Sequence, residues 1–105
     1  YYLIIMGIYL FDQYTYLHFA TGIIAYFFNI SLVSWFLLHS VFELIENTNI
    51  GINIINIYLK FWPGGKPYKD SFINSIGDTL GTIIGWLSAY ILNKYGKKYK
   101  LYKNI

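Results

Sequence analysis

The chain contains no cysteine and no arginine, and only 12% of its 105 residues carry a charged side chain. The lack of cysteine excludes disulfides and thiolate ligands. The lack of arginine means that no guanidinium group is present to donate paired hydrogen bonds to phosphates and bases, so no nucleic-acid partner is expected. Soluble domains average about 25% charged residues. The deficit therefore indicates an integral membrane protein, with the lipid bilayer as its main partner.

Apolar residues make up 56% of the chain, which also has 12 Tyr, 8 Phe and 3 Trp. Aromatic rings of this kind gather at membrane interfaces. Five of the eight lysines lie within residues 94–105. We expect this Lys-rich C-terminus on the cytoplasmic or equivalent side, with residues 48–69 on the opposite side. The bias toward Ile, Asn, Lys and Tyr is typical of an AT-rich genome, such as that of a bacterium, an organelle or a large DNA virus.

Residues 70–86 carry the most informative pattern. Gly77, Gly81 and Gly85 are spaced four apart, so in a helix they form one stripe. Each glycine costs up to about 1 kcal/mol relative to alanine in a helix, and a soluble helix does not concentrate three of them on one face. In a membrane, such a stripe lets another helix backbone approach closely. We therefore predict that these glycines pack against a neighbouring helix.

The hydrophobic pattern predicts an all-α fold: a polytopic transmembrane helical bundle with three full spans and a partial first span. The apolar residues 1–11 are too few for a whole span, since the hydrocarbon layer is about 30 Å thick. A cleaved signal sequence would need a basic n-region and a small-residue cleavage site, which are not visible. We predict one transmembrane domain over residues 1–93, with helices at about 1–11, 15–28, 31–47 and 70–93, an interfacial connector at 48–69 that turns at 62–67, and a Lys-rich tail at 94–105.

Polar residues recur at helical spacing on the predicted helices. Because consecutive helices alternate in direction, we expect them to meet at the membrane side opposite the Lys-rich tail. An ionisable group inside a bilayer costs several kcal/mol unless it is paired or wetted. The predicted polar intramembrane cluster consists of His18, His39, Glu43, Glu46, Asn47, Asp70, Asn74 and Asp78.

Three interpretations of this cluster are open. It is a polar network that only locks the helices together, a divalent-metal or catalytic site, or a site for proton or ion handling. Carboxylates combined with histidine suit Mg²⁺, Mn²⁺ or Zn²⁺, and His18, Glu43 and Asp78 are the candidate ligands. No residue is assigned a catalytic role, and the pattern does not decide whether the protein is an enzyme.

Three blocks carry a resemblance: Tyr14-Thr15-x-x-His18-x-x-x-Gly22, Glu43-Leu-Ile-Glu46-Asn47, and Asp70-Ser71-x-x-Asn74-Ser75-x-x-Asp78-Thr79. Over about residues 12–92 the chain resembles an uncharacterised family of small polytopic bacterial inner-membrane proteins, and more distantly the VanZ-like proteins. It departs from the family pattern at three positions, with Thr21 in place of a histidine, His39 in place of an acid and Phe42 in place of a tryptophan. The resemblance implies a four-helix membrane protein with intramembrane His, Glu, Asn and Asp, and implies no activity.

Two functions follow from these patterns. The first is a small membrane protein with a polar pocket in one leaflet that binds a divalent metal ion or a lipid headgroup. A lipid-modifying enzyme would be a protein of this kind. The alternative is a structural membrane subunit, without catalytic activity, that packs against other membrane subunits in a larger assembly such as a virion membrane or an organellar complex.

Overall fold

The computed structural model describes residues 8–59, 66 and 68–101. These residues form four helices and no strands, so the all-α prediction is confirmed. Judged by length and hydropathy together, none of the described helices meets the requirement for crossing a membrane. The helices are α1 (Thr15–Phe27), α2 (Leu32–Glu46), α3 (Asn49–Tyr58) and α4 (Phe72–Lys98).

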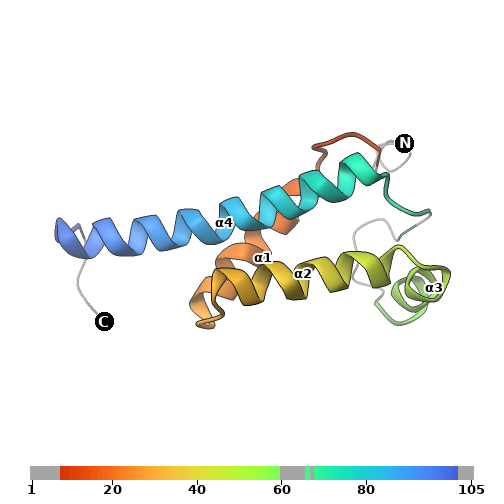
Figure 1. Cartoon of the computed structure of the whole chain (residues 1–105), viewed down its shortest axis with the longest axis horizontal. Coiled ribbons are helices and arrows are strands. Elements are labelled where there is room, and N and C mark those ends of the chain that lie inside the picture. The colour runs from red at the N-terminus through yellow and green to blue at the C-terminus, as the bar shows by residue number, and fades with distance from the viewer. Residues whose placement is uncertain (1–7, 60–65, 67, 102–105) are drawn as a thin grey trace.

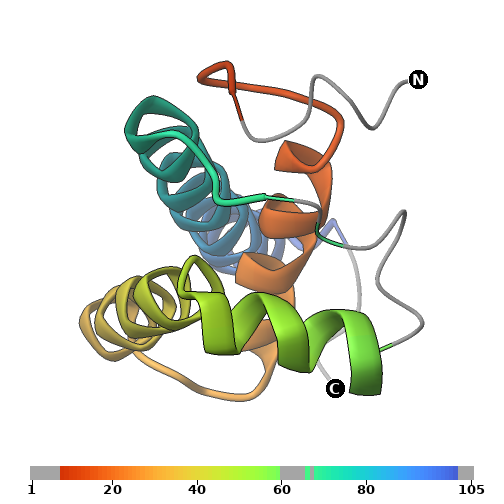
Figure 2. The same cartoon turned by 90° about the vertical axis from the view of Figure 1, so that its right-hand side faces the viewer.

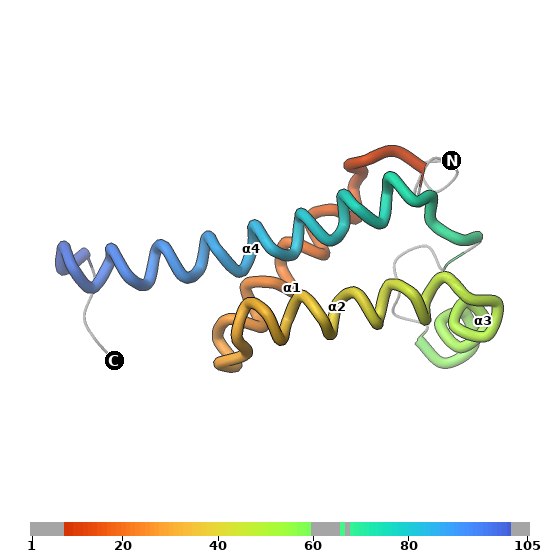
Figure 3. The backbone as a smooth tube through the Cα atoms, in the orientation of Figure 1, coloured from red at the N-terminus to blue at the C-terminus, as the bar shows by residue number. Residues whose placement is uncertain are grey.

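The four helices form a small bundle with one helix across its end. Figure 1 shows α2 and α4 running in opposite directions, with α1 crossing between their ends, and Figure 3 traces the same path as a tube. The α1 helix packs chiefly against α4. Helix α3 is seen end-on in Figure 1 and side-on in Figure 2, so it lies crosswise to α2, the helix it packs against, at one end of the bundle. This is the end at which α2 finishes and α4 begins.

Short polar side chains start three of the helices. Ser31 accepts a hydrogen bond from the Ser34 backbone N–H at 3.2 Å and so caps the start of α2. Thr48 and Ser71 cap α3 and α4 in the same way, through the N–H groups three residues later. The caps fix where α2 and α4 begin, and so fix which of their residues face inward.

Two helices end in Schellman motifs. Asn29 has a φ of 61°, and the N–H of Ile30 donates to the Ala25 carbonyl, five residues back, at 3.1 Å. The same geometry ends α4 at Lys100, whose φ is 55°. The predicted helix over 70–93 therefore continues to Lys98, because nothing in the intervening sequence stops it.

Two segments differ from the sequence-based prediction. Residues 1–7 lie outside the described residues, but residues 8–11 of the predicted first span form turns and bends rather than a helix. The carbonyl of Ile8 accepts a hydrogen bond from Ser71 Oγ, so this backbone is held by α4. The predicted connector contains the ten-residue helix α3, because its isoleucines and asparagines also fit helical spacing. The predicted turn at 62–67 falls almost wholly outside the described residues.

The glycine stripe lies in the interface between α4 and the N-terminal part of the chain. A Cβ on Gly85 would overlap the Phe19 carbonyl oxygen of α1, and one on Gly77 would overlap the Leu10 carbonyl oxygen. Gly81 is less tightly packed, since a Cβ there would lie 3.1 Å from Thr15 Cγ2. On α1, Gly22 faces the Thr82 carbonyl equally closely. The small residues bring the two helix backbones into contact.

Hydroxyl groups also join the helices at this interface between α1 and α4, which we call the glycine seam. Thr82 is fully buried, and its Oγ1 lies 3.0 Å from Thr21 Oγ1. The same oxygen accepts a hydrogen bond from Trp35 Nε1 of α2 at 2.9 Å. One hydroxyl on α4 therefore links all three long helices.

Burial is inverted relative to a water-soluble domain. The buried side chains include His39, Glu43, Glu46, Asn74 and Asp78, whereas the large apolar side chains of all four helices are mostly exposed. Phe72 is 81% exposed and Leu44 74% exposed. Among the described residues, the buried apolar ones are Ala25, Ile55 and Ala89. The bundle is thus held by its glycine seam and its polar interior, and presents its apolar side chains outward.

Candidate metal centre

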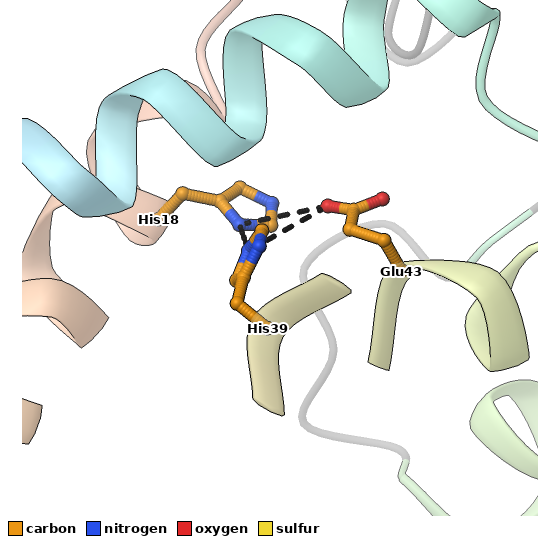
Figure 4. A group of neighbouring side chains, drawn as sticks. All are labelled: His18, His39 and Glu43. Atoms are coloured by element: carbon orange, nitrogen blue, oxygen red, sulfur yellow. Dashed lines mark hydrogen bonds and ion pairs between the residues drawn. The ribbon is translucent and has the colours of Figure 1, made fainter. Parts of the chain in front are cut away.

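His18, His39 and Glu43 meet in the interior between α1 and α2 (Figure 4). His18 Nδ1 lies 3.0 Å from His39 Nε2 and 3.9 Å from Glu43 Oε1. The remaining pair, His39 Nε2 and Glu43 Oε1, is 3.7 Å apart. His39 and Glu43 are four residues apart on α2, so the helix presents both toward the same point.

The three atoms have the spacing of ligands around one transition-metal ion. A point equidistant from atoms separated by 3.0, 3.9 and 3.7 Å lies about 2.1 Å from each. This equals the usual length of a zinc bond to a histidine nitrogen or a carboxylate oxygen. We call these three residues the metal triad. Two imidazoles and one carboxylate form a familiar ligand set for zinc and for non-haem iron.

Asp78 holds the other side of the His18 ring. Its Oδ2 lies 3.2 Å from His18 Nε2, while His18 Nδ1 faces the triad. With Nε2 as the protonated, donating nitrogen, Nδ1 keeps its lone pair, which here accepts the hydrogen bond from His39 Nε2 and would bind an ion in place of that proton. The candidate ligand set predicted from sequence was His18, Glu43 and Asp78. The structure instead brings His39 to the third position, because the two nitrogens of one histidine ring cannot face the same ion.

Asn47 connects the triad to the start of α4. Its amide Nδ2 lies 2.9 Å from the Glu43 carbonyl oxygen and 3.3 Å from Glu43 Oε2. Its Oδ1 accepts the Asp70 backbone N–H at 2.8 Å. The amide thus donates a hydrogen bond to the Glu43 oxygen that does not face the histidines, and orients the carboxylate.

A second acidic group lies beside the triad. Glu43, Glu46 and Asp70 each offer an oxygen within 4.8 Å of the others. Lys66 reaches into this group, with its Nζ 3.0 Å from Asp70 Oδ1 and 3.8 Å from Glu46 Oε2. We call Glu43, Glu46 and Asp70 the acidic group. Glu43 belongs to both clusters.

Lys66 was missed by sequence reasoning, which treats a lysine in a connector as solvated. It is 4% exposed, and Asn56 of α3 fixes its backbone through hydrogen bonds of 2.9 and 2.7 Å. The one signal in the sequence is its spacing of four residues from Asp70.

Asn74 has a different place from the one predicted. Its side chain donates to the Tyr9 carbonyl at 2.7 Å and to Asp12 Oδ2 at 3.1 Å. It therefore fastens the N-terminal segment onto α4 and contacts neither cluster. The other predicted residues, His18, His39, Glu43, Glu46, Asn47, Asp70 and Asp78, belong to one connected polar interior.

Four buried polar atoms of this interior have no hydrogen-bond partner among the described residues. They are His39 Nδ1, Glu43 Oε1, Glu46 Oε1 and Asp78 Oδ1. Buried polar atoms are almost always paired, and an unpaired one costs about 1–3 kcal/mol. Lys66 is the one buried lysine in the described part of the chain, against three buried acids and the half-buried Asp70. Acidic side chains therefore outnumber lysines in the interior.

No protein-family model, curated protein or solved structure matches the chain. The functional argument therefore rests on the geometry of the polar interior and on the chemistry of its side chains.

Proposed function

We propose that the protein is a membrane-resident metalloprotein that binds a divalent transition-metal ion through the metal triad of His18, His39 and Glu43. The observation that carries the proposal is the spacing of the three ligand atoms, which fit one ion at about 2.1 Å. The ion would also satisfy Glu43 Oε1, which is buried and unpartnered among the described residues.

The partners of the triad support this assignment. Metal-bound histidines usually donate their second ring nitrogen to a carboxylate or carbonyl, and ligating carboxylates are themselves hydrogen-bonded. Asp78 and Asn47 fill these two roles for His18 and Glu43. Three protein ligands leave a coordination position for water or for an oxygen of a lipid headgroup, which is the arrangement of catalytic rather than purely structural zinc sites.

The bilayer is the proposed solvent because the exposed faces are apolar. Val33, Leu44 and Phe72 are each at least 70% exposed, and few charges interrupt them outside the end of α4. Helix α4, at 27 residues and about 40 Å, is longer than the hydrocarbon layer of about 30 Å, but its sequence is less apolar than a membrane span requires. Helix α3 lies across the bundle end like an interfacial helix. The resemblance to small inner-membrane proteins stays a prediction that agrees with this location.

The orientation follows from the lysines at the C-terminal end of α4. Lys94, Lys97, Lys98 and Lys100 are exposed there, whereas Asp78, which contacts His18 of the metal triad, lies in the second turn of α4. Positive charge is retained on the cytoplasmic side of membranes. We therefore propose that the triad lies in the leaflet away from the cytoplasm or its equivalent.

A structural membrane subunit is the competing proposal. It is supported by the direct contact of His18 with Asp78 at 3.2 Å, which joins α1 to α4 without a metal. In that case the exposed apolar faces would pack against other subunits of an assembly, and the polar interior would only lock the bundle.

Thermal stability in detergent separates the two proposals. The purified protein should melt at a higher temperature with Zn²⁺ than with chelator, because an ion that binds only the folded state stabilises it. Glu43→Gln should abolish this increase, since the neutral amide is a poor ligand, whereas Asp12→Asn, an acid outside both clusters, should retain it. Equal melting temperatures of the unmodified protein with Zn²⁺, with Mn²⁺ and with chelator would leave the structural proposal standing.

A further inference from the structure

We infer that the acidic group of Glu43, Glu46 and Asp70 is a second divalent-cation site, so that the protein holds two metal ions bridged by Glu43. The inference rests on the proposed function, since it adds a second ion to the first. Its ligand oxygens lie within 4.8 Å of one another, and opposite oxygens around a cation with bonds of 2.1–2.4 Å are about 4–5 Å apart.

Glu46 provides the independent observation. Its side chain is 2% exposed, and Oε1 has no hydrogen-bond partner among the described residues. Its Oε2 is 3.8 Å from Lys66 Nζ, which is too far for a hydrogen bond. A buried carboxylate in this condition requires a cation or a proton close by. Glu46 contributes one carboxylate oxygen to the group with Glu43 and Asp70, and a cation bound by its carboxylate would satisfy the unpartnered atom.

Lys66 indicates that the position already favours positive charge. Its ammonium is buried between Glu46 and Asp70 and makes its hydrogen bond, at 3.0 Å, to Asp70. An ammonium and a divalent cation compete for the same carboxylates. We therefore assign Lys66 as the counter-ion that holds the acidic group until the second ion displaces it.

Charge and ligand type both fit two ions. Once the ammonium of Lys66 is displaced and the carboxyl groups have lost their protons, Glu43, Glu46, Asp70 and Asp78 carry four negative charges, which two divalent ions would balance. The triad contains imidazoles and suits zinc, iron or manganese, whereas three carboxylates suit manganese, magnesium or calcium. Mn²⁺ is the ion common to both ligand sets. A proton held between the Glu43 and Glu46 carboxyl groups is the competing explanation of the unpartnered oxygens.

Titration of the detergent-purified full chain with Mn²⁺, followed by electron paramagnetic resonance, tests the inference. The unmodified chain should bind two ions with an exchange-coupled spectrum. Glu46→Gln should bind one ion with an uncoupled spectrum, and so should His39→Gln, which removes a ligand of the triad only. One ion bound by the unmodified chain and lost in His39→Gln, or two ions bound by Glu46→Gln, would overturn the second site while leaving the triad intact. One ion bound by the unmodified chain and retained in His39→Gln would overturn the triad as its site. No ion bound by the unmodified chain would overturn both.

Lys66→Met tests the competition. Removing the ammonium should tighten binding of the second Mn²⁺ by roughly tenfold, because the ion no longer displaces a buried charge. The matched control is Lys69→Met, which removes an exposed lysine three residues away and should leave both affinities unchanged. An unchanged affinity of Lys66→Met for the second Mn²⁺ would show that Lys66 is not the counter-ion that this ion displaces.

Discussion

His18 Nε2 lies 3.2 Å from Asp78 Oδ2, and this contact joins the start of α1 to the second turn of α4. It fixes the ring so that Nδ1 faces His39 and Glu43 on α2. The contact therefore does two things: it connects two helices, and it sets which histidine nitrogen can bind a metal.

Asp78→Asn should weaken metal binding without abolishing it. The amide can present its NH₂ to His18 Nε2 and reverse the tautomer, which would place the proton on the nitrogen that faces the metal. Loss of such a supporting carboxylate typically costs about 10–100-fold in metal affinity. Zn²⁺ competition against a chromophoric chelator measures the effect, with Asp12→Asn as the control. An unchanged affinity would mean that Asp78 does not orient the ligand.

The two seam glycines should differ in their tolerance of alanine. A Cβ on Gly85 would overlap the Phe19 carbonyl, so Gly85→Ala must push α1 and α4 apart, at a cost of about 1–3 kcal/mol. At Gly81 the nearest atom is a side-chain methyl at 3.1 Å, and the gain in helix propensity offsets the crowding. Unfolding in detergent compares the two, with the outward Ile84→Leu as a neutral control. Equal stability of the two alanine variants would refute the close contact at Gly85.

Thr82→Val should be more destabilising than Thr79→Val. The first substitution leaves the Trp35 N–H without its acceptor and removes the contact with Thr21, at an expected cost of about 1–3 kcal/mol. Thr79 only donates back to the Ser75 carbonyl within α4, so its loss should be small. Thermal unfolding of the two variants gives the comparison. A Thr82→Val protein as stable as Thr79→Val would show that the hydroxyl does not join the three helices.

Patterns confined to one helix were predictable from the sequence. The spacing of His39, Glu43 and Glu46 placed them on one face of α2, and the glycine stripe anticipated the close approach to α1. The assignment of His39 rather than Asp78 to the triad was not predictable, because it depends on which nitrogen of His18 faces which helix. Sequence spacing gives the face of a helix, but not the orientation of a ring between two helices.

The roles of Lys66 and Thr82 were also beyond the sequence. Lys66 is buried only because Asn56 holds its backbone and Asp70 receives its ammonium, and these contacts span a connector. The hydroxyl of Thr82 is shared by Trp35 and Thr21. The role of Thr82 depends on contacts between residues far apart in the sequence, and that of Lys66 on contacts with Asn56 and Asp70 across the connector, and helical periodicity reports neither.

The proposed membrane orientation can be tested with single cysteines, because the natural chain has none. Lys98→Cys at the end of α4 should react with an impermeant thiol reagent only from the cytoplasmic side. Asn53→Cys, on the exposed side of α3, should react only from the other side. Intact and inverted vesicles provide the two conditions. Labelling of both cysteines from the same side would exclude the proposed crossing by α4.

X-ray absorption at the zinc edge tests the metal triad most directly. Zinc-loaded protein should retain one zinc per triad after dialysis and show two imidazole ligands together with oxygen at about 2.0–2.2 Å. His39→Gln should reduce the imidazole scattering from two rings to one. Loss of all zinc on dialysis, or a bound zinc without imidazole ligands, would contradict the metal centre of His18, His39 and Glu43.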